Sequence, residues 1–172
     1  MADTTTHFIQ VAWVVADLEK SMQRWLTTAQ VGPFYVFRHA KVERVSYRGA
    51  PATLDFSAAL TQAGPIQIEL IEQHGDTPSA YRDSFAPGQE GFHHLCMMTH
   101  GFDAEIERHR KEGSVAATEG VFGDMRFAYI DTRARLGHMT EIIEDRASIR
   151  EMFKMVADAA EGWDGKNPIR VI

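Results

Sequence analysis

Two stretches of the chain share one alternation of polar and apolar positions. In each, a polar residue opens an apolar run: the runs are Gln10–Val15, followed by Asp17, and His94–Met98, followed by Asp103. Runs rich in β-branched and aromatic residues are typical of strands. An aspartate just ahead of an apolar stripe at helical spacing is typical of a helix N-terminus. Each stretch therefore predicts a strand that leads into a helix.

The alternation also predicts which side of each strand faces inward. Successive side chains of a strand point to opposite faces. The bulkier face of the first strand consists of Val11, Trp13 and Val15. We expect this face to lie against helices, which leaves Gln10, Ala12 and Val14 on the opposite face. In the second strand, His94, Cys96 and Met98 share one face, and Leu95, Met97 and Thr99 share the other.

The rest of the first half reads as one helix and several strands. Apolar residues at helical spacing follow Asp17, and Gly32 with Pro33 ends that helix. Strands are predicted at Phe34–Phe37, Val42–Tyr47, Thr53–Leu60 and Ile66–Glu72, with a turn at Arg48–Pro51. A short helical turn is expected around Ser79–Phe85.

The second half repeats this order. A helix is predicted at Asp103–Glu112, where Gly113 supplies a residue that readily ends helices. The strands that follow are predicted at Val115–Glu119, Arg126–Asp131 and Met139–Glu144. Ile149–Val156 then has the spacing of an amphipathic helix, and the pattern places no element after Gly162.

The repetition predicts two βαβββ modules, at residues 7–73 and 91–145, within a single domain of residues 1–172. Residues 146–172 form the C-terminal helix and tail. We expect an α+β fold in which the modules form a curled mixed sheet around a shared cleft.

Polar residues recur at matching places in the two modules. Glu69 lies inside an apolar strand of the first module, and Glu141 lies inside the corresponding strand of the second. With Gln10 and His94, they supply one nitrogen and several oxygen ligands, a set that suits a divalent ion. Each residue also has an ordinary interpretation, as a solvent-facing glutamate or glutamine or a partly buried histidine. The metal site is favoured because each lies on the strand face opposite the one that packs against helices, and because the two halves repeat the arrangement.

Composition and charge exclude several classes of function. The net charge of −6 argues against a nucleic-acid partner, since such binding relies on Lys and Arg at phosphates. Cys96 is the only cysteine, so no intrachain disulfide is expected. No apolar run approaches the roughly 20 residues that cross a bilayer, and residues 1–6 do not resemble a signal peptide. We expect a cytoplasmic protein without a membrane partner.

The strands that carry these polar residues resemble the vicinal oxygen chelate (VOC) superfamily of glyoxalases, bleomycin resistance proteins and extradiol dioxygenases. The resemblance rests on Gln10–Ser21, Ile68–Glu72, Gly91–Leu95 and Gly137–Glu144, and covers about residues 7–145. It is nearest to the branch of methylmalonyl-CoA epimerase and glyoxalase I.

The resemblance implies that the metal ligands are Gln10, Glu69, His94 and Glu141. His94 rather than the neighbouring His93 fits the motif, and His7 is interpreted as a residue at the entry to the first strand. The resemblance further implies one divalent ion, Co, Ni, Zn or Mn. The implied reaction removes a proton next to a carbonyl, with Glu141 as the first choice for the base and Glu69 as the second.

Several alternatives within the superfamily stay open. Dioxygenase chemistry fits poorly, because such enzymes hold iron with two histidines and one carboxylate. A metal-free binding or resistance protein on the same fold remains the alternative to an isomerase, epimerase or lyase. The sequence does not separate a glyoxalase I-like function from an epimerase-like one. The ligand set favours a glyoxalase I-like function, whereas the connector that begins at Asp76 favours an epimerase-like function. The epimerase uses a second carboxylate, for which only Glu43 and Asp55 lie nearby.

The substrate is expected to be a small molecule: an acyl-CoA thioester, a glutathione adduct or another carbonyl compound. Apolar residues that could line its pocket are Phe34, Tyr35, Phe37, Phe56, Met98, Met125, Phe127 and Tyr129. A homodimer is a further possible partner. The terminal helix with Met152 and Phe153 could cover its interface or close the chain's own core, and we favour the second.

Overall fold

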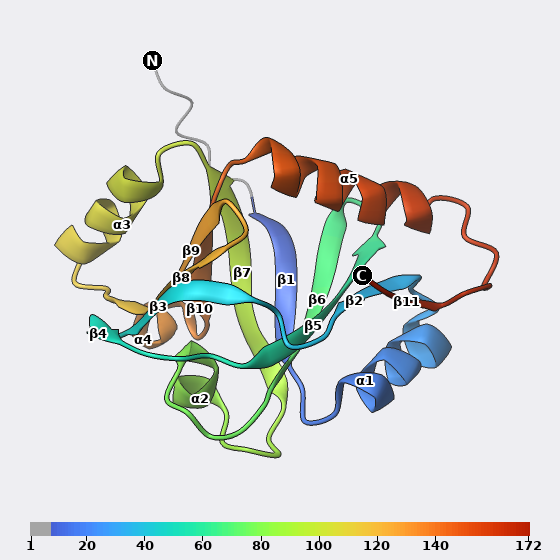
Figure 1. The fold of residues 1–172 in the computed structure, drawn as a ribbon, viewed down its shortest axis with the longest axis horizontal. Coiled ribbons are helices and arrows are strands. Elements are labelled where there is room, and N and C mark those ends of the chain that lie inside the picture. Colours follow the sequence, from blue (N-terminus) through green and yellow to red (C-terminus); the bar gives the residue numbers. More distant parts are fainter. Residues whose placement is uncertain (1–7) are drawn as a thin grey trace.

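The computed structural model describes residues 8–172, which form one mixed sheet with helices packed against it (Figure 1). The prediction for His7 lies outside the described residues. The described strands are β1 (Phe8–Val14), β2 (Phe34–Phe37), β3 (Val42–Tyr47), β4 (Ala50–Pro51), β5 (Phe56–Ala63), β6 (Ile66–Gln73), β7 (Gly91–Thr99), β8 (Ala116–Phe122), β9 (Met125–Ile130), β10 (Met139–Glu144) and β11 (Ile169–Val171). The described helices are α1 (Leu18–Arg24), which continues as the π-helical turn η1 (Trp25–Ala29), α2 (Ala80–Ser84), α3 (Phe102–Lys111), α4 (Arg133–Leu136) and α5 (Ala147–Ala160).

The two halves of the chain meet at the centre of the sheet. Its strand order is β11-β2-β5-β6-β1-β7-β10-β9-β8-β3-β4. β1 pairs antiparallel with β7, and each pairs in parallel with the last strand of its own half, β6 or β10. The sheet curls, so that β3 passes in front of the central strands in Figure 1. The predicted α+β class with a curled mixed sheet is confirmed.

The two faces of the sheet bury different residues. On the outer face, Ile68 and Leu70 of β6 pack with Leu18 and Met22 of α1, and Met97 of β7 packs with the first residues of α3. On the inner face, the core includes Ala12, Cys96 and Ile143. This division matches the faces predicted from the alternation in β1 and β7.

One predicted strand of the first half pairs with the second half. β3 lies beside β8, with Val42 opposite Phe122, whereas the first half's own strands β2 and β5 pair directly with each other. Arg48 and Gly49 both have positive φ, and they turn the chain from β3 into the short strand β4. Residues 38–41 therefore carry the chain across from the first half to the second.

The C-terminal segment closes the inner face. Helix α5 lies along one side of the curled sheet in Figure 1. Its Ile149 joins the inner core, and Val156 packs with Tyr35 and Leu60. The tail, for which the sequence predicted no element, ends in β11, which pairs in parallel with β2. Among residues 8–172, no helix has the length and apolar character needed to span a membrane.

Candidate metal centre

The polar residues predicted to converge lie on the four central strands. Ala12 of β1 is paired with both Glu69 of β6 and His94 of β7. Two residues earlier, Gln10 is paired with Cys96, which in turn is paired with Glu141 of β10. Paired residues of neighbouring strands point to the same face, so the register places all four predicted residues on the inner face.

Three of these side chains form one compact group. The Nε2 atom of His94 lies 3.2 Å from Oε2 of Glu141 and 3.6 Å from Oε2 of Glu69. His94 is fully buried and Glu141 is 7% exposed. The structure therefore brings together a histidine and two carboxylates from three different strands.

Gln10 lies in the same pocket, but its amide has a hydrogen-bond partner. Its side chain is buried, and Nε2 donates to Oε1 of Gln67 at 2.7 Å, the residue opposite it on β6. Only the amide oxygen of Gln10 is a metal ligand by its chemistry. Its role as the fourth ligand stays a prediction.

A β-bulge places His93 directly behind His94. The pairing of β7 with β1 skips His93, because Ala12 is opposite His94 and Trp13 is opposite Phe92. Bulges re-aim side chains in this way. His93 is consequently buried, with its ring 5.2 Å from that of His94, instead of pointing to the outer face.

The contacts of His93 define the proton positions on His94. His93 Nε2 donates to the carbonyl of Ala80 at 3.0 Å, and burial lowers the pKa of His93 to about 3, so the ring is neutral. Its Nδ1 therefore accepts a hydrogen bond, at 2.9 Å, from Nδ1 of His94. A neutral His94 then carries its lone pair on Nε2, which is buried and without a hydrogen-bond partner.

The two glutamates are held in different electrostatic environments. Burial, together with the charge of Glu141, raises the pKa of Glu69 well above its usual range. Burial also acts to raise the pKa of Glu141, whereas hydrogen bonds with Cys96 and Tyr129 act to lower it and favour the charged carboxylate. Two carboxylates facing one buried space repel each other, and a cation between them would offset that repulsion.

The group fits a divalent ion on geometry as well. Nitrogen and oxygen ligands bind ions such as zinc at about 2.0–2.2 Å, which separates neighbouring ligand atoms by roughly 3–3.5 Å. The two distances from His94 are close to that range. The free lone pair of His94 and the two facing carboxylates make Glu69, His94 and Glu141 the residues that would hold the ion.

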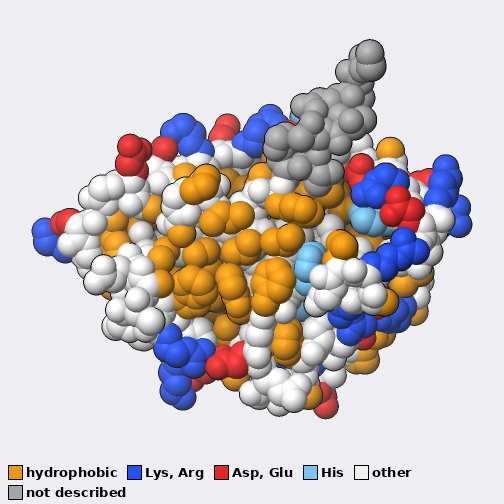
Figure 2. All heavy atoms as spheres, turned by 180° about the vertical axis from the view of Figure 1, so that it is seen from behind, with side chains coloured by type: hydrophobic (Ala, Val, Ile, Leu, Met, Phe, Trp, Pro, Cys, Tyr) orange, Lys and Arg blue, Asp and Glu red, His pale blue; other side chains and the backbone are white. Residues whose placement is uncertain are grey.

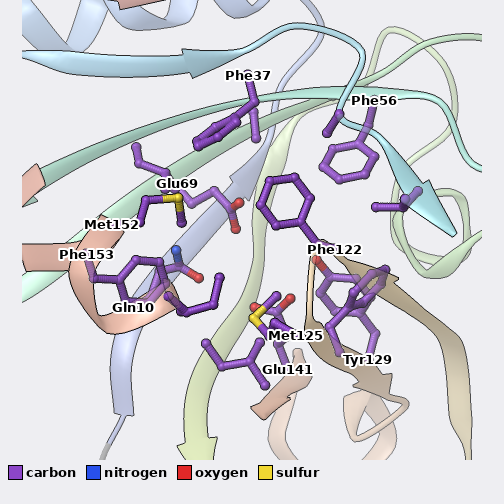
Figure 3. Close-up of a pocket in the computed structure, with 17 residues that line it drawn as sticks. Gln10, Phe37, Phe56, Glu69, Phe122, Met125, Tyr129, Glu141, Met152 and Phe153 are labelled. Carbon is purple, nitrogen blue, oxygen red and sulfur yellow. The ribbon is translucent and has the colours of Figure 1, made fainter. Parts of the chain in front are cut away.

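An apolar pocket opens beside this group (Figure 3). The carboxylate of Glu69 points into the space between Phe122 and Met152. The cavity measures about 80 Å³, less than the roughly 300–1,000 Å³ of sites for drug-sized ligands. Of the residues predicted to line it, five do so: Phe37, Phe56, Met125, Phe127 and Tyr129.

Three predicted lining residues lie elsewhere, and the helix α5 supplies wall residues that were not predicted. Phe34, Tyr35 and Met98 pack in the core around the strands. The unpredicted part of the wall includes Phe122 of β8 and three residues of α5: Ile149, Met152 and Phe153. The apolar spacing of α5 was the available signal, but it did not indicate what the helix covers.

No Lys or Arg lines the pocket among the residues that the structure describes. Two arginines form ion pairs elsewhere: Arg48, in the turn after β3, with Asp83 and Asp131, and Arg126 of β9 with Asp103 and Glu144. The two acids considered as a second carboxylate are also outside the pocket lining. Glu43 is exposed on β3, and Asp55 pairs with His39.

Comparison with solved structures identifies similar folds. A hypothetical protein from Bacillus halodurans aligns with a TM-score of 0.54 at 14% identity, over 83% of this chain and 96% of its own. Methylmalonyl-CoA epimerase from Mycobacterium tuberculosis aligns with a TM-score of 0.52 at 15% identity, over 88% of this chain and 96% of its own. A methylmalonyl-CoA epimerase variant from Streptomyces coelicolor, in complex with 2-nitronate-propionyl-CoA, aligns with a TM-score of 0.53 at 16% identity, over 84% of this chain and 97% of its own.

At these identities the likeness concerns the fold. A search of the curated proteins found no match to the chain. The family model described as Glyoxalase/Bleomycin resistance protein/Dioxygenase superfamily matches residues 9–129, which is well over half of the sequence. The chain therefore belongs to the glyoxalase/bleomycin resistance protein/dioxygenase superfamily, as its strand motifs indicated.

Proposed function

We propose that this protein is a divalent-metal-dependent isomerase, epimerase or lyase that removes a proton from carbon next to a carbonyl. The observation that supports it best is the buried group of Glu69, His94 and Glu141, in which His94 presents an unpartnered Nε2. When bound, a divalent ion such as Co, Ni, Zn or Mn supplies Lewis-acid stabilisation of the negative charge that develops on substrate oxygens.

For the base, the surroundings support Glu69 ahead of Glu141. The carboxylate of Glu69 points into the pocket, where a substrate carbon would lie. Glu141 is set deeper, beside His94 and Tyr129, as suits a fixed ligand. A carboxylate whose pKa is raised also accepts a carbon-bound proton more readily. Both remain candidates, and the exchange experiment below separates them.

The pocket favours a compact carbonyl compound with an apolar substituent. Its walls are mainly aromatic and aliphatic, and its volume is small. An acyl group with its own carboxylate would bring a third negative charge beside Glu69 and Glu141, with no lysine or arginine in the described lining to balance it. Among the three predicted substrate classes, this supports other carbonyl compounds over acyl-CoA thioesters and glutathione adducts.

Two measurements test the proposal. The first is the metal content of protein purified without chelator, which we expect to include a divalent ion that Glu141→Gln weakens. The second is solvent deuterium exchange at the α-carbon, screened over acyl-CoA thioesters, glutathione hemithioacetals and compact hydroxyketones. Because Glu69 is also one of the three proposed ligands, Glu69→Gln should weaken metal binding as well, but it should suppress exchange even when the ion is supplied in excess. If neither Co nor Ni binds, the alternative gains support: a metal-free protein that sequesters an apolar ligand in the same pocket.

We also propose that the protein is cytoplasmic and forms a homodimer. Because α5 covers its own chain's pocket, a second copy would need another surface. Hydrophobic side chains gather in the middle of the face shown in Figure 2. Light scattering of the purified protein measures the oligomeric state directly.

A further inference from the structure

A second cluster of metal-binding side chains lies outside the pocket. It consists of His39 in the turn after β2, Asp55 just before β5 and His74 just after β6, and we call it the rim cluster. Each residue offers one ligand atom, and the three atoms lie within 4.8 Å of one another. The pairing of Phe56 with Gln73 places the ends of β5 and β6 together, and His74 N donates to the carbonyl of Asp55 at 2.9 Å.

The backbone brings the third residue to the same place. Ala40 N donates to the carbonyl of Phe56 at 2.7 Å, which fixes the turn after β2 against the start of β5. The ring of His39 then lies over that of His74, with centroids 4.3 Å apart, and His39 Nδ1 contacts Oδ1 of Asp55 at 2.7 Å.

A buried serine holds both histidines. Ser57 is 1% exposed, and its Oγ accepts a hydrogen bond from His39 N at 3.0 Å and contacts His74 Nε2 at 2.8 Å. The contact at His74 Nε2 is of the kind that orients a ligating histidine and selects which nitrogen is free, while the contact at His39 fixes its backbone. The rim cluster is therefore held in place before any ligand arrives.

We propose that His39, Asp55 and His74 form a second site for a divalent transition-metal ion, best matched by zinc. Two imidazoles and one carboxylate are a recurrent set of three protein ligands for zinc, with water in the fourth position. Imidazole also suits copper and nickel, whereas hard ions such as magnesium prefer oxygen. The site differs from the buried centre, whose described group has one histidine and two carboxylates.

The expected role of the ion is to fasten the rim of the pocket. Phe37, Ala40 and Phe56 are neighbours of the rim cluster in the sequence, and all three line the pocket. An ion bound to the cluster would link the segment that crosses between the two halves to the ends of β5 and β6. This role does not depend on the proposed function.

Zinc titration of metal-free protein, followed by native mass spectrometry and calorimetry, tests the proposal. We expect two equivalents in the wild type. His39→Asn or Asp55→Asn should weaken one of them at least tenfold and leave the other unchanged. Asparagine tolerates the left-handed backbone of His39, which has φ 46°. It also matches the shape of Asp55, so neither substitution is expected to disturb folding.

The matched control is His100→Asn. His100 Nε2 lies 3.0 Å from Asp145 Oδ2, but among the described residues this pair belongs to no group of three possible metal ligands. It should bind zinc like the wild type. The rim site would be overturned if the wild type bound a single equivalent that Glu141→Gln removes and His39→Asn leaves intact; the proposed function would then still stand. If the wild type bound a single equivalent that only His39→Asn removes, the rim site would stand and the proposed function would be overturned.

Discussion

At the scale of single residues, the pair His93–His94 carries the most chemical information. Adjacent residues of a regular strand point to opposite faces, yet the bulge in β7 turns both rings inward. The carbonyl of Ala80 orients His93, and His93 in turn orients His94. The outcome is a lone pair on His94 Nε2 that faces two carboxylates.

This chain of contacts predicts that His93 controls metal affinity without touching the ion. His93→Phe keeps an aromatic ring but removes the acceptor that orients His94. Loss of such outer contacts typically weakens metal binding about 10–100-fold, and we expect a loss in that range, measured by competition with a chromophoric chelator. His109→Phe replaces another buried histidine, on α3, and should leave affinity unchanged. Equal affinity of His93→Phe and the wild type would contradict the tautomer argument.

The sequence predicts the positions of the site residues but not all of their contacts. The positions of Glu69, His94 and Glu141 on one face follow from strand alternation and from the repeat, and the structure brings them together as predicted. The hydrogen bond from His94 to His93 could not be predicted, because it depends on the bulge in β7. The bulge in turn depends on the register between β7 and β1, which the alternation within one strand does not reveal. The hydrogen bond between Gln10 and Gln67 depends on register in the same way.

At the scale of elements, close packing decides several connections that polarity patterns leave open. β3 was predicted as a strand, but its partner β8 is far away in the sequence, and alternation alone does not reveal partners. The tail is ordered by its pairing with β2 and by contact of Trp163 with the turn at Gly32. Neither contact has a periodic signal in the sequence.

Gly32 gives a direct test of the contact between tail and turn. A Cβ at this position would lie 2.7 Å from the ring of Trp163 and 2.8 Å from Leu26. Overpacking of this kind costs about 1–3 kcal/mol, so we expect Gly32→Ala to lower the free energy of unfolding by that amount, measured in urea. Gly101→Ala is the matched control, because its nearest neighbour would be 3.7 Å away. A Gly32→Ala protein as stable as the control would show that the tail yields freely.

The ion pairs at the end of β10 predict that stability falls on acidification. Hydrogen bonds from Arg126 and Arg146 lower the pKa of Glu144 to about 2, and Arg126 also binds Asp103 of α3. Because the folded pKa lies below the unfolded value, the stabilisation is present above about pH 4.5 and is lost as the pH falls toward 2. Glu144→Gln should therefore lower stability at neutral pH and reduce the loss of stability on acidification.

Thermal unfolding between pH 2.5 and 7 measures this effect. Glu151→Gln removes an exposed carboxylate of α5 and should follow the wild-type pH profile. Parallel profiles for Glu144→Gln and the wild type would mean that the ion pairs do not contribute to stability.

At the scale of the whole molecule, the curled sheet and α5 together make the pocket. The sheet supplies the group of Glu69, His94 and Glu141 from its central strands and aromatic residues from β2, β5, β8 and β9, while α5 closes one side. The family fold is thus combined with a C-terminal element that limits the space beside the glutamates. The side chains of α5 therefore limit the size of the pocket as much as those of the sheet do.

Shortening Phe153 should therefore enlarge the range of ligands that the protein accepts. Phe153 and Met152 of α5 line the cavity of about 80 Å³, and Phe153→Ala removes most of one wall side chain (Figure 3). Phe153 is only partly buried, so we expect a stability loss below the roughly 3–5 kcal/mol of a fully buried Phe→Ala change. A neutral apolar dye should bind about tenfold more tightly to the variant.

Met155→Ala provides the comparison on the same helix, because Met155 is 39% exposed and does not line the pocket. It should bind the dye like the wild type, and the deuterium-exchange screen should extend to bulkier carbonyl compounds only with Phe153→Ala. If both variants bind the dye equally, α5 does not limit the pocket, and access must instead be set by Phe37 and Phe122, whose rings lie 5.6 Å apart between β2 and β8.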